Sequence, residues 1–292
     1  IVIIFLAGLS LLLYPFVANQ WNNYRQKQLI SEYDSIVSAE DAAGEIDYAA
    51  ELEKARAYNE ALLPSILPDS FAIAEATEGE DKAYMDCLNI AGDGIMGIVE
   101  IPKIDIKLPI YHTTREDVLQ VAAGHLEGSS LPIGGKSTHA VISAHRGLPS
   151  ASLFTDLDQM EKGDIFILHI LGKHLAYKVD QIKTVLPNET SDLDIIEGED
   201  HVTLITCTPY GVNTHRLLVR GVRTKYVVED TKNDETIPQK LAVVDPKRVL
   251  AGGAAVLVVL ILLIYLIVRH RDKKRKKKQL SERKEEAESD EK

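Results

Sequence analysis

Short runs of β-branched and aromatic residues, separated by turn residues, fill the chain from residue 95 to residue 228. Such runs predict strands, and several of them in close succession predict a barrel or sandwich, not alternating strand and helix units. We therefore expect a mainly β domain, a barrel over residues 95–228, with short helices starting near Thr114 and covering 152–160. The expected strands are 96–101, 107–111, 139–144, 164–170, 175–185, 201–206 and 216–222.

Before the barrel, residues 19–63 carry apolar positions at helical spacing, for example Leu29 and Tyr33. We expect two helices there, forming a stalk that packs on the domain. Residues 64–94 are rich in Pro, Gly and acidic side chains and predict a long loop with one short helix near 84–88. Loops of this length are usually functional covers or disordered linkers.

Two long apolar segments flank these elements. Residues 249–268 contain no charged side chain, and about 20 apolar residues suffice for a helix to cross a bilayer. The basic run that opens residues 269–292 predicts a cytoplasmic tail, so the barrel is expected outside the cell, with 229–248 as the linker. Residues 1–18 are interpreted as a first transmembrane helix, truncated because no Met opens the chain, with a signal peptide as the alternative.

The formal net charge of the chain is −11 even though its tail is basic. An acidic exterior argues against a nucleic-acid partner. The basic tail can contact anionic membrane lipid, although its main expected role is to fix the topology. Cys87 and Cys207 are the only cysteines, too few for a disulfide framework. No cluster of His, Cys and carboxylate side chains has metal-ligand spacing, so we expect neither a metal nor another cofactor.

Cys207 is the strongest candidate for chemistry, because it ends an apolar strand and is followed by a turn and then by Arg216. A cysteine attacks only as the thiolate, which needs a base or a positive group beside it. His145 ends another apolar strand, and two strand ends on one rim of a barrel can bring their side chains together. Arg216 stays protonated and can stabilise an oxyanion; a structural ion pair is its alternative role.

Other histidines fit less well. His215 is next to Arg216, and neighbours along a strand point to opposite faces, so both cannot face one site. His125, just before a turn, is the weaker rival to His145. Taken alone, Cys207, His145 and Arg216 in an exported barrel predict acyl transfer through a thioester, resolved by water or an amine.

These residues also carry a family resemblance. Thr203-Leu-Ile-Thr-Cys207 resembles the TLxTC signature of sortases, Arg216 stands at the family's arginine position, and Ser143-Ala-His145 resembles its histidine motif. Further segments resemble class C, the pilus-building sortases, as does the apolar segment near the carboxyl end. They are 97–102, 108–111, 124–132, 145–151 and 207–211.

The resemblance implies an eight-stranded sortase barrel in the plasma membrane of a Gram-positive bacterium. Cys207 would cleave an LPXTG-like sorting signal of a pilin between Thr and Gly and hold the pilin as a thioester. His145 would act as acid and base, and Arg216 would steady the oxyanion. A lysine amine of another pilin would then accept the acyl group, so that pilins polymerise through isopeptide bonds.

Class C enzymes also carry a lid, usually Asp-Pro-aromatic, whose acid pairs with the arginine and whose ring covers the cysteine. The matching place here reads Asp69-Ser70-Phe71, with Ser70 in place of the proline that restricts the backbone. Asp69 and Phe71 supply both chemical functions of a lid. The alternative for Asp69 is a solvated helix cap.

Three alternatives to pilus assembly remain open at this point. A sortase that anchors surface proteins to the cell wall would pass the same acyl group to a lipid II amine. A non-catalytic membrane-tethered module would keep the barrel only to bind peptides. A thiol protease would pass the acyl group to water. Cys87 is expected to be a buried apolar side chain, with a regulatory disulfide to Cys207 as its alternative.

Overall fold

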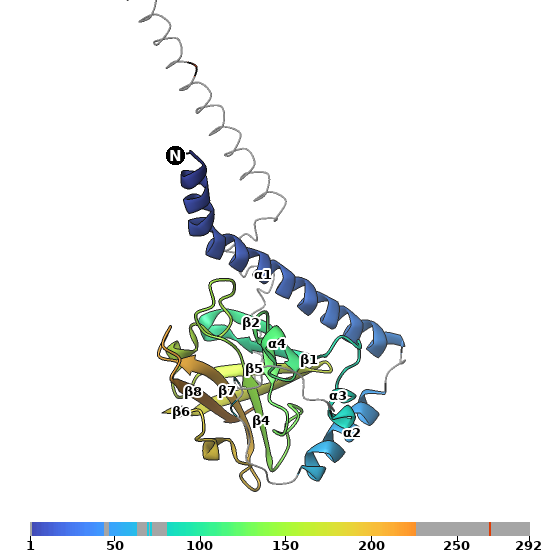
Figure 1. The fold of residues 1–292 in the computed structure, drawn as a ribbon. Helices are drawn as coiled ribbons and strands as arrows, with labels where there is room; N and C mark the ends of the chain where they lie inside the picture. The colour runs from blue at the N-terminus through green and yellow to red at the C-terminus, as the bar shows by residue number, and fades with distance from the viewer. Residues whose placement is uncertain are drawn as a thin grey trace, which may run out of the picture. The chain divides into compact units, whose positions relative to one another are not determined.

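The computed structural model describes residues 2–43, 47–62, 69, 71, 81–225 and 269. Eight strands close into a barrel in the order β1-β2-β3-β4-β7-β8-β6-β5, which confirms the predicted fold class (Figure 1). The β2/β3 and β4/β7 pairs are parallel, and the other pairs are antiparallel. The chain divides into two compact units, 1–237 and 238–292, and the barrel belongs to the first.

Seven of the eight strands are the predicted ones, each within one or two residues. The short strand β3 was not predicted, because three residues carry too little alternation to be recognised. The strands are β1 (Ile95–Ile101), β2 (Ile106–His112), β3 (Ala123–His125), β4 (Thr138–Ser143), β5 (Ile165–Ile170), β6 (Lys173–Val185), β7 (Asp200–Thr208) and β8 (His215–Arg223).

Both faces of β4 and β7 are buried, which explains why apolar side chains occur at consecutive positions in these strands and not only at every second one. Along these strands Ile142 and Leu204 join the main core, which draws residues from all eight strands. On the opposite face Val141 and Ile205 join a second cluster with Leu218 of β8. This second cluster, called the outer cluster below, lies beneath the side chains of the candidate site.

The predicted stalk consists of α1 (Val2–Ala43) and α2 (Tyr48–Ala61). Helix α1 is continuous through the expected boundary at residue 18. The helix packs on the barrel through an apolar cluster, in which Ile30, Tyr33 and Val37 of α1 contact residues of β1. Helix α2 is capped by Asp47, whose carboxylate accepts hydrogen bonds from two backbone N–H groups of the first turn.

The remaining helical elements are short. The predicted helix near 84–88 is α3 (Lys82–Met85), and the one near Thr114 is α4 (Glu116–Leu119). The predicted helix over 152–160 is wrong in length, because only a 3₁₀ turn, η2 (Leu157–Gln159), forms there. Two further 3₁₀ turns are η1 (Pro102–Ile104) and η3 (Ser191–Leu193).

Among the residues that the structure describes, no helix has both the length and the hydropathy needed to cross a bilayer. The first predicted span, residues 1–18, therefore has no support from the structure. The linker 229–248, the second predicted span 249–268 and nearly all of the tail 269–292 lie outside the described residues, as do most of residues 64–80.

Candidate active site

Cys207 and His145 leave two neighbouring strands at the same end of the barrel. In the parallel β4/β7 pair Ser143 lies beside Ile205, and each candidate side chain follows two residues later. Because side chains alternate along a strand, both extend toward the face of the outer cluster. This pairing therefore brings the thiol and the imidazole to one rim of the barrel, as their positions at strand ends predicted. Thr206 reinforces this, because its hydroxyl donates to the Ala144 backbone oxygen at 2.8 Å.

Arg216 lies directly across from Cys207 in the antiparallel β7/β8 pair. Its Nη1 donates to the backbone oxygens of Asn213, at 3.1 Å, and His215, at 3.2 Å. These two bonds hold the guanidinium at the start of β8, beside the sulfur. The predicted arginine is thus also at the rim, and it adds a fixed positive charge there.

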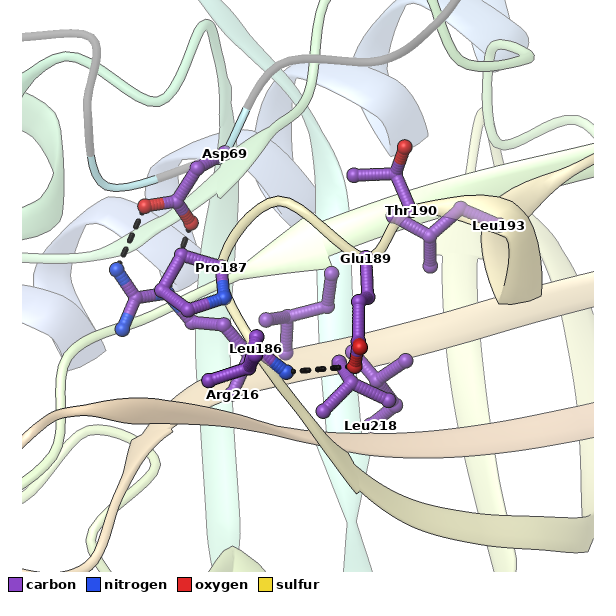
Figure 2. Close-up of a pocket in the computed structure, with 10 residues that line it drawn as sticks. Asp69, Leu186, Pro187, Glu189, Thr190, Leu193, Arg216 and Leu218 are labelled. Atoms are coloured by element: carbon purple, nitrogen blue, oxygen red, sulfur yellow. Dashed lines mark hydrogen bonds and ion pairs between the residues drawn. The ribbon is translucent and has the colours of Figure 1, made fainter.

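Asp69 and Phe71 cover this group of side chains. The Asp69 carboxylate accepts two hydrogen bonds from Arg216, from Nε at 2.7 Å and from Nη2 at 2.6 Å (Figure 2). The Phe71 ring centre lies 5.0 Å from the Arg216 Cζ and 5.3 Å from the centre of the His145 ring. A bidentate ion pair of this kind is strong and directional. Asp69 is thus bonded to the arginine and is not a solvated cap, and Cys207 is only 6% exposed.

The electrostatics favour an uncharged pair of Cys207 and His145. Burial raises the pKa of the Cys207 thiol, and Asp69 adds to that rise while Arg216 opposes it. Burial also lowers the pKa of His145, with Arg216 acting in the same direction and Glu116 opposing it. With Asp69 in place, the prevailing form at neutral pH is therefore thiol and neutral imidazole.

A pocket opens beside Arg216, between β6, β7, β8 and the loop that joins β6 to β7 (Figure 2). The loop turns back on itself, because the Leu186 N–H donates to the Glu189 carboxylate at 3.0 Å. This side of the pocket was not predicted from the sequence, where the Pro-Asn-Glu turn before the Cys207 strand is the feature that indicates it. The lining residues are Asp69, Val185, Leu186, Pro187, Glu189, Thr190, Leu193, Ile205, Arg216 and Leu218.

The two rival histidines have other partners. His125 is fully buried, with Nδ1 3.0 Å from the Tyr84 hydroxyl and Nε2 2.8 Å from the Ser130 backbone oxygen. Because a carbonyl oxygen only accepts, Nε2 carries the proton and the ring is a neutral structural group. His215 has its Nδ1 2.9 Å from the neighbouring Thr214 hydroxyl.

Cys87 is a structural thiol on the segment that includes α3. It is 1% exposed, and its Sγ donates to the Ala83 backbone oxygen at 3.1 Å. Burial raises the pKa of the Cys87 thiol. Cys87 and Cys207 are both free cysteines, so the structure does not contain a disulfide between them. In the described part of the chain, no group of three His, Cys, Asp or Glu side chains is arranged to hold a metal ion.

Comparison with known proteins identifies the fold. Residues 99–224 match the Sortase domain family. Sortase C of Streptococcus pneumoniae is 47% identical, with a TM-score of 0.60, and the match covers 69% of this chain and 98% of that one. The chain belongs to the sortase family. Sortase C-1 of Actinomyces oris is similar as well, with 44% identity, a TM-score of 0.59, and coverage of 61% and 98%. Class C sortases are thus its structural neighbours, as the motifs predicted.

Curated relatives agree on the family and differ in class. Sortase D of Bacillus subtilis is 31% identical over 130 residues, which is 44% of this chain and 63% of that protein. Sortase A of Streptococcus agalactiae is 30% identical over 146 residues, 49% of this chain and 58% of the relative. The chain therefore spans about three fifths of the length of these two relatives. Sortases are cysteine transpeptidases, which agrees with the enzyme class that the family resemblance implied.

Proposed function

We propose that this sortase is a cysteine transpeptidase that cleaves an LPXTG-like sorting signal of a pilin between Thr and Gly and joins the pilin to a lysine amine of another. The observation that carries the proposal is the convergence of Cys207, His145 and Arg216 on one barrel rim, under Asp69 and Phe71. Among its neighbours, sortase C of S. pneumoniae has pilin substrates, and sortase C1 of the group B streptococcus belongs to a pilus island.

In the first half-reaction His145 takes the proton of the Cys207 thiol, and the sulfur attacks the carbonyl carbon of the sorting-signal threonine. The oxyanion of the tetrahedral intermediate lies beside Arg216, whose N–H groups stabilise it. As the C–N bond breaks, His145 returns the proton to the leaving glycine amine. The products are a Thr–Cys207 thioester and a peptide that begins with glycine.

In the second half-reaction a neutral lysine amine attacks the thioester carbonyl. His145 takes a proton from the attacking nitrogen, and the C–S bond breaks as the second tetrahedral intermediate collapses. The sulfur leaves as a thiolate and regains its proton from His145. Bonds and protons balance without any cofactor: one amide is broken and one isopeptide is formed.

Arg216 serves this cycle only after it exchanges partners. Its Nε and Nη2 are bonded to Asp69, so those donors reach an oxyanion only when the carboxylate moves away. The Nη1 bonds to Asn213 and His215 involve the other nitrogen, so they hold the guanidinium in place during the exchange. We propose that Asp69 and Phe71 form a lid that occupies the site until a sorting signal displaces it.

We also propose that the chain acts at the plasma membrane of a Gram-positive bacterium, with the barrel outside the cell and the tail in the cytoplasm. The support is the charge-free segment 249–268, followed by a basic run. On this topology the barrel meets exported pilins. The membrane lipid is then a partner of the basic tail.

The test is mass spectrometry of the protein mixed with sorting peptides, with a lysine peptide as acceptor. We expect an acyl adduct on Cys207 whose mass corresponds to the peptide up to threonine, followed by a peptide joined to lysine. Cys207→Ala should form no adduct, and Cys87→Ala should form it as the wild type does. Transfer only to lipid II amines would identify a wall-anchoring enzyme, and hydrolysis alone a protease. An adduct that persists in Cys207→Ala would refute the assignment.

A further inference from the structure

Helix α1 carries a row of amide side chains on the face that meets the barrel. Asn19, Asn22 and Gln26 are spaced i, i+3 and i+7, so they lie along one side of the helix. Asn22 is 8% exposed and Gln26 is 6% exposed. Further along the helix the contacts to the barrel are made by apolar side chains such as Ile30 and Val37. Buried amides are costly unless they are hydrogen-bonded, so their partners show what the row is for.

The first two amides bind the loop that follows His145. The Asn19 Oδ1 accepts two hydrogen bonds from Ser152, from the backbone N–H at 3.0 Å and from the hydroxyl at 3.1 Å. The Asn22 Nδ2 donates to the Ser150 backbone oxygen at 3.3 Å. Asn19 and Asn22 thus hold the backbone of this loop at Ser152 and Ser150.

This loop closes back on His145. The Phe154 N–H donates to the His145 backbone oxygen at 3.0 Å. Between these residues Leu148 and Ala151 form an antiparallel bridge, so the loop is compact and not a loose excursion. The backbone of His145 is therefore linked, through one short and closed loop, to the residues that α1 holds.

The third amide binds the segment on the other side of the site. The Gln26 Nε2 donates to the Val121 backbone oxygen at 2.9 Å. Val121 lies two residues beyond the end of α4, and its own N–H donates to the Val118 oxygen within that helix at 3.0 Å. Helix α4 begins with Glu116, whose charge acts on His145. The row thus contacts both chain segments that set the surroundings of the imidazole.

We propose that Asn19, Asn22 and Gln26 of α1 are positioning residues that hold the imidazole of His145 in register with Cys207. The proposal rests on the proposed function, in which His145 transfers protons in both half-reactions. It gives the stalk a part in the chemistry, where the sequence predicted only packing. Small displacements of an acid or base are costly, because proton transfer needs hydrogen-bond distance to the reacting atoms.

The test compares variants that remove or keep the contacts of α1 to Ser150 and Ser152. In the full chain Asn19→Ala removes the acceptor, whereas Asn19→Asp keeps an oxygen there to accept both bonds. We expect the Asn19→Ala,Asn22→Ala double variant to lose roughly tenfold in kcat with KM for the sorting peptide unchanged, since remote misplacement of a catalytic group acts on the transition state. Asn19→Asp, in which Asn22 is unchanged, should keep kcat within about twofold of wild type.

Gln28→Ala is the matched control, because Gln28 is an exposed amide on the same helix whose Nε2 donates to the hydroxyl of Tyr24, also on α1, at 3.1 Å. A second readout needs no sorting peptide: the pH profile of Cys207 alkylation, in which the limb that depends on His145 should shift in the double variant and not in Gln28→Ala. This readout tests the positioning even if the peptide assay shows that the proposed function is wrong. The proposal is overturned if the double variant matches Gln28→Ala in kcat and in pH profile, or if the loss of kcat equals a loss of folded protein.

Discussion

At the scale of single residues, the chemistry of the site is decided by which partner Arg216 has. Bonded to Asp69, the guanidinium is neutralised, and the carboxylate adds to the burial that raises the pKa of Cys207. Freed from Asp69, it leaves a positive charge beside the sulfur, which favours the thiolate. Asp69 therefore restrains the nucleophile while the pair is closed, and Arg216 supports both the nucleophile and the oxyanion once the pair is open.

Removing the lid contacts should make Cys207 more reactive. Asp69→Asn withdraws a charge that raises the pKa of the thiol, and each unit of lowered pKa gives about tenfold more thiolate below that pKa. Phe71→Ala opens access to the sulfur. We expect the double variant to react with iodoacetamide at least about fivefold faster than wild type at pH 7.

Asp180→Asn is the control, since Asp180 makes a similar bidentate pair with Arg220 on β6 and β8. It should change the rate of alkylation by less than about twofold, because surface pairs away from a site have little effect on it. An unchanged rate in Asp69→Asn,Phe71→Ala would mean that these residues do not restrain Cys207.

The directions of the two pKa shifts also determine the pH profile. The reactive form needs thiolate and imidazolium together, whereas the raised pKa of Cys207 and the lowered pKa of His145 favour thiol and neutral imidazole. The reactive fraction is therefore small and constant between the two pKa values, and kcat/KM falls on both sides of that plateau. In Asp69→Asn we expect a higher plateau whose alkaline limit lies at lower pH. Plateaus of equal height would contradict this account.

At the scale of elements, β4, β7 and β8 could be predicted well because each is a largely apolar run with a candidate residue at one end, His145 after β4, Cys207 at the end of β7 and Arg216 at the start of β8. The in-register pairing that brings Cys207, His145 and Arg216 together could be expected only as a shared rim, since register depends on partners distant in sequence. The contact of Asp69 with Arg216 could be predicted only from the family resemblance, because the two residues are far apart in the sequence. The amide row of α1 escaped prediction because Asn and Gln on a helix normally indicate exposure.

The wall of the pocket depends on a tether between β4 and the loop before β7. The His139 Nδ1 donates to the Asp194 backbone oxygen at 2.9 Å, and its Nε2 accepts from the Thr203 hydroxyl at 2.7 Å. Because the carbonyl oxygen only accepts, the tautomer is fixed. Asp194 follows η3, whose Leu193 packs on Ile205 and lines the pocket. His139 thereby fixes one side of the pocket without lining it.

Two substitutions separate this tether from simple packing. In His139→Asn the amide N–H lies near the position of Nδ1 and keeps the hydrogen bond to Asp194. In His139→Gln the longer amide reaches toward Thr203, and the hydrogen bond to Asp194 is lost. We expect His139→Gln to raise KM for the sorting peptide roughly fivefold with little change in kcat. A fivefold change in KM corresponds to the loss of one net hydrogen bond of about 1 kcal/mol. His139→Asn should stay near wild type. Equal KM values in both variants would show that the tether does not shape the pocket.

At the scale of the whole molecule, the barrel buries neutral histidines that link its stability to pH. Burial lowers the pKa of His125 to about 4 and the pKa of His139 to about 4, from an ordinary value of 6.5. The unfolded chain therefore binds more protons than the folded chain between pH 6.5 and pH 4, so the free energy of unfolding decreases as pH falls through that window. Above pH 6.5 this contribution is fully present and constant.

This linkage predicts the acid limit of the fold. Each of the two histidines should remove roughly 2 kcal/mol from the free energy of unfolding between pH 6.5 and pH 5, a range in which few carboxylates titrate. Urea unfolding at half-unit steps of pH measures the slope. His139→Asn, which cannot be protonated, should lower stability at pH 7 but remove the contribution of His139 from the slope. A slope that is the same in wild type and His139→Asn would assign the acid sensitivity to other groups, because only a residue that titrates in that window can contribute to it.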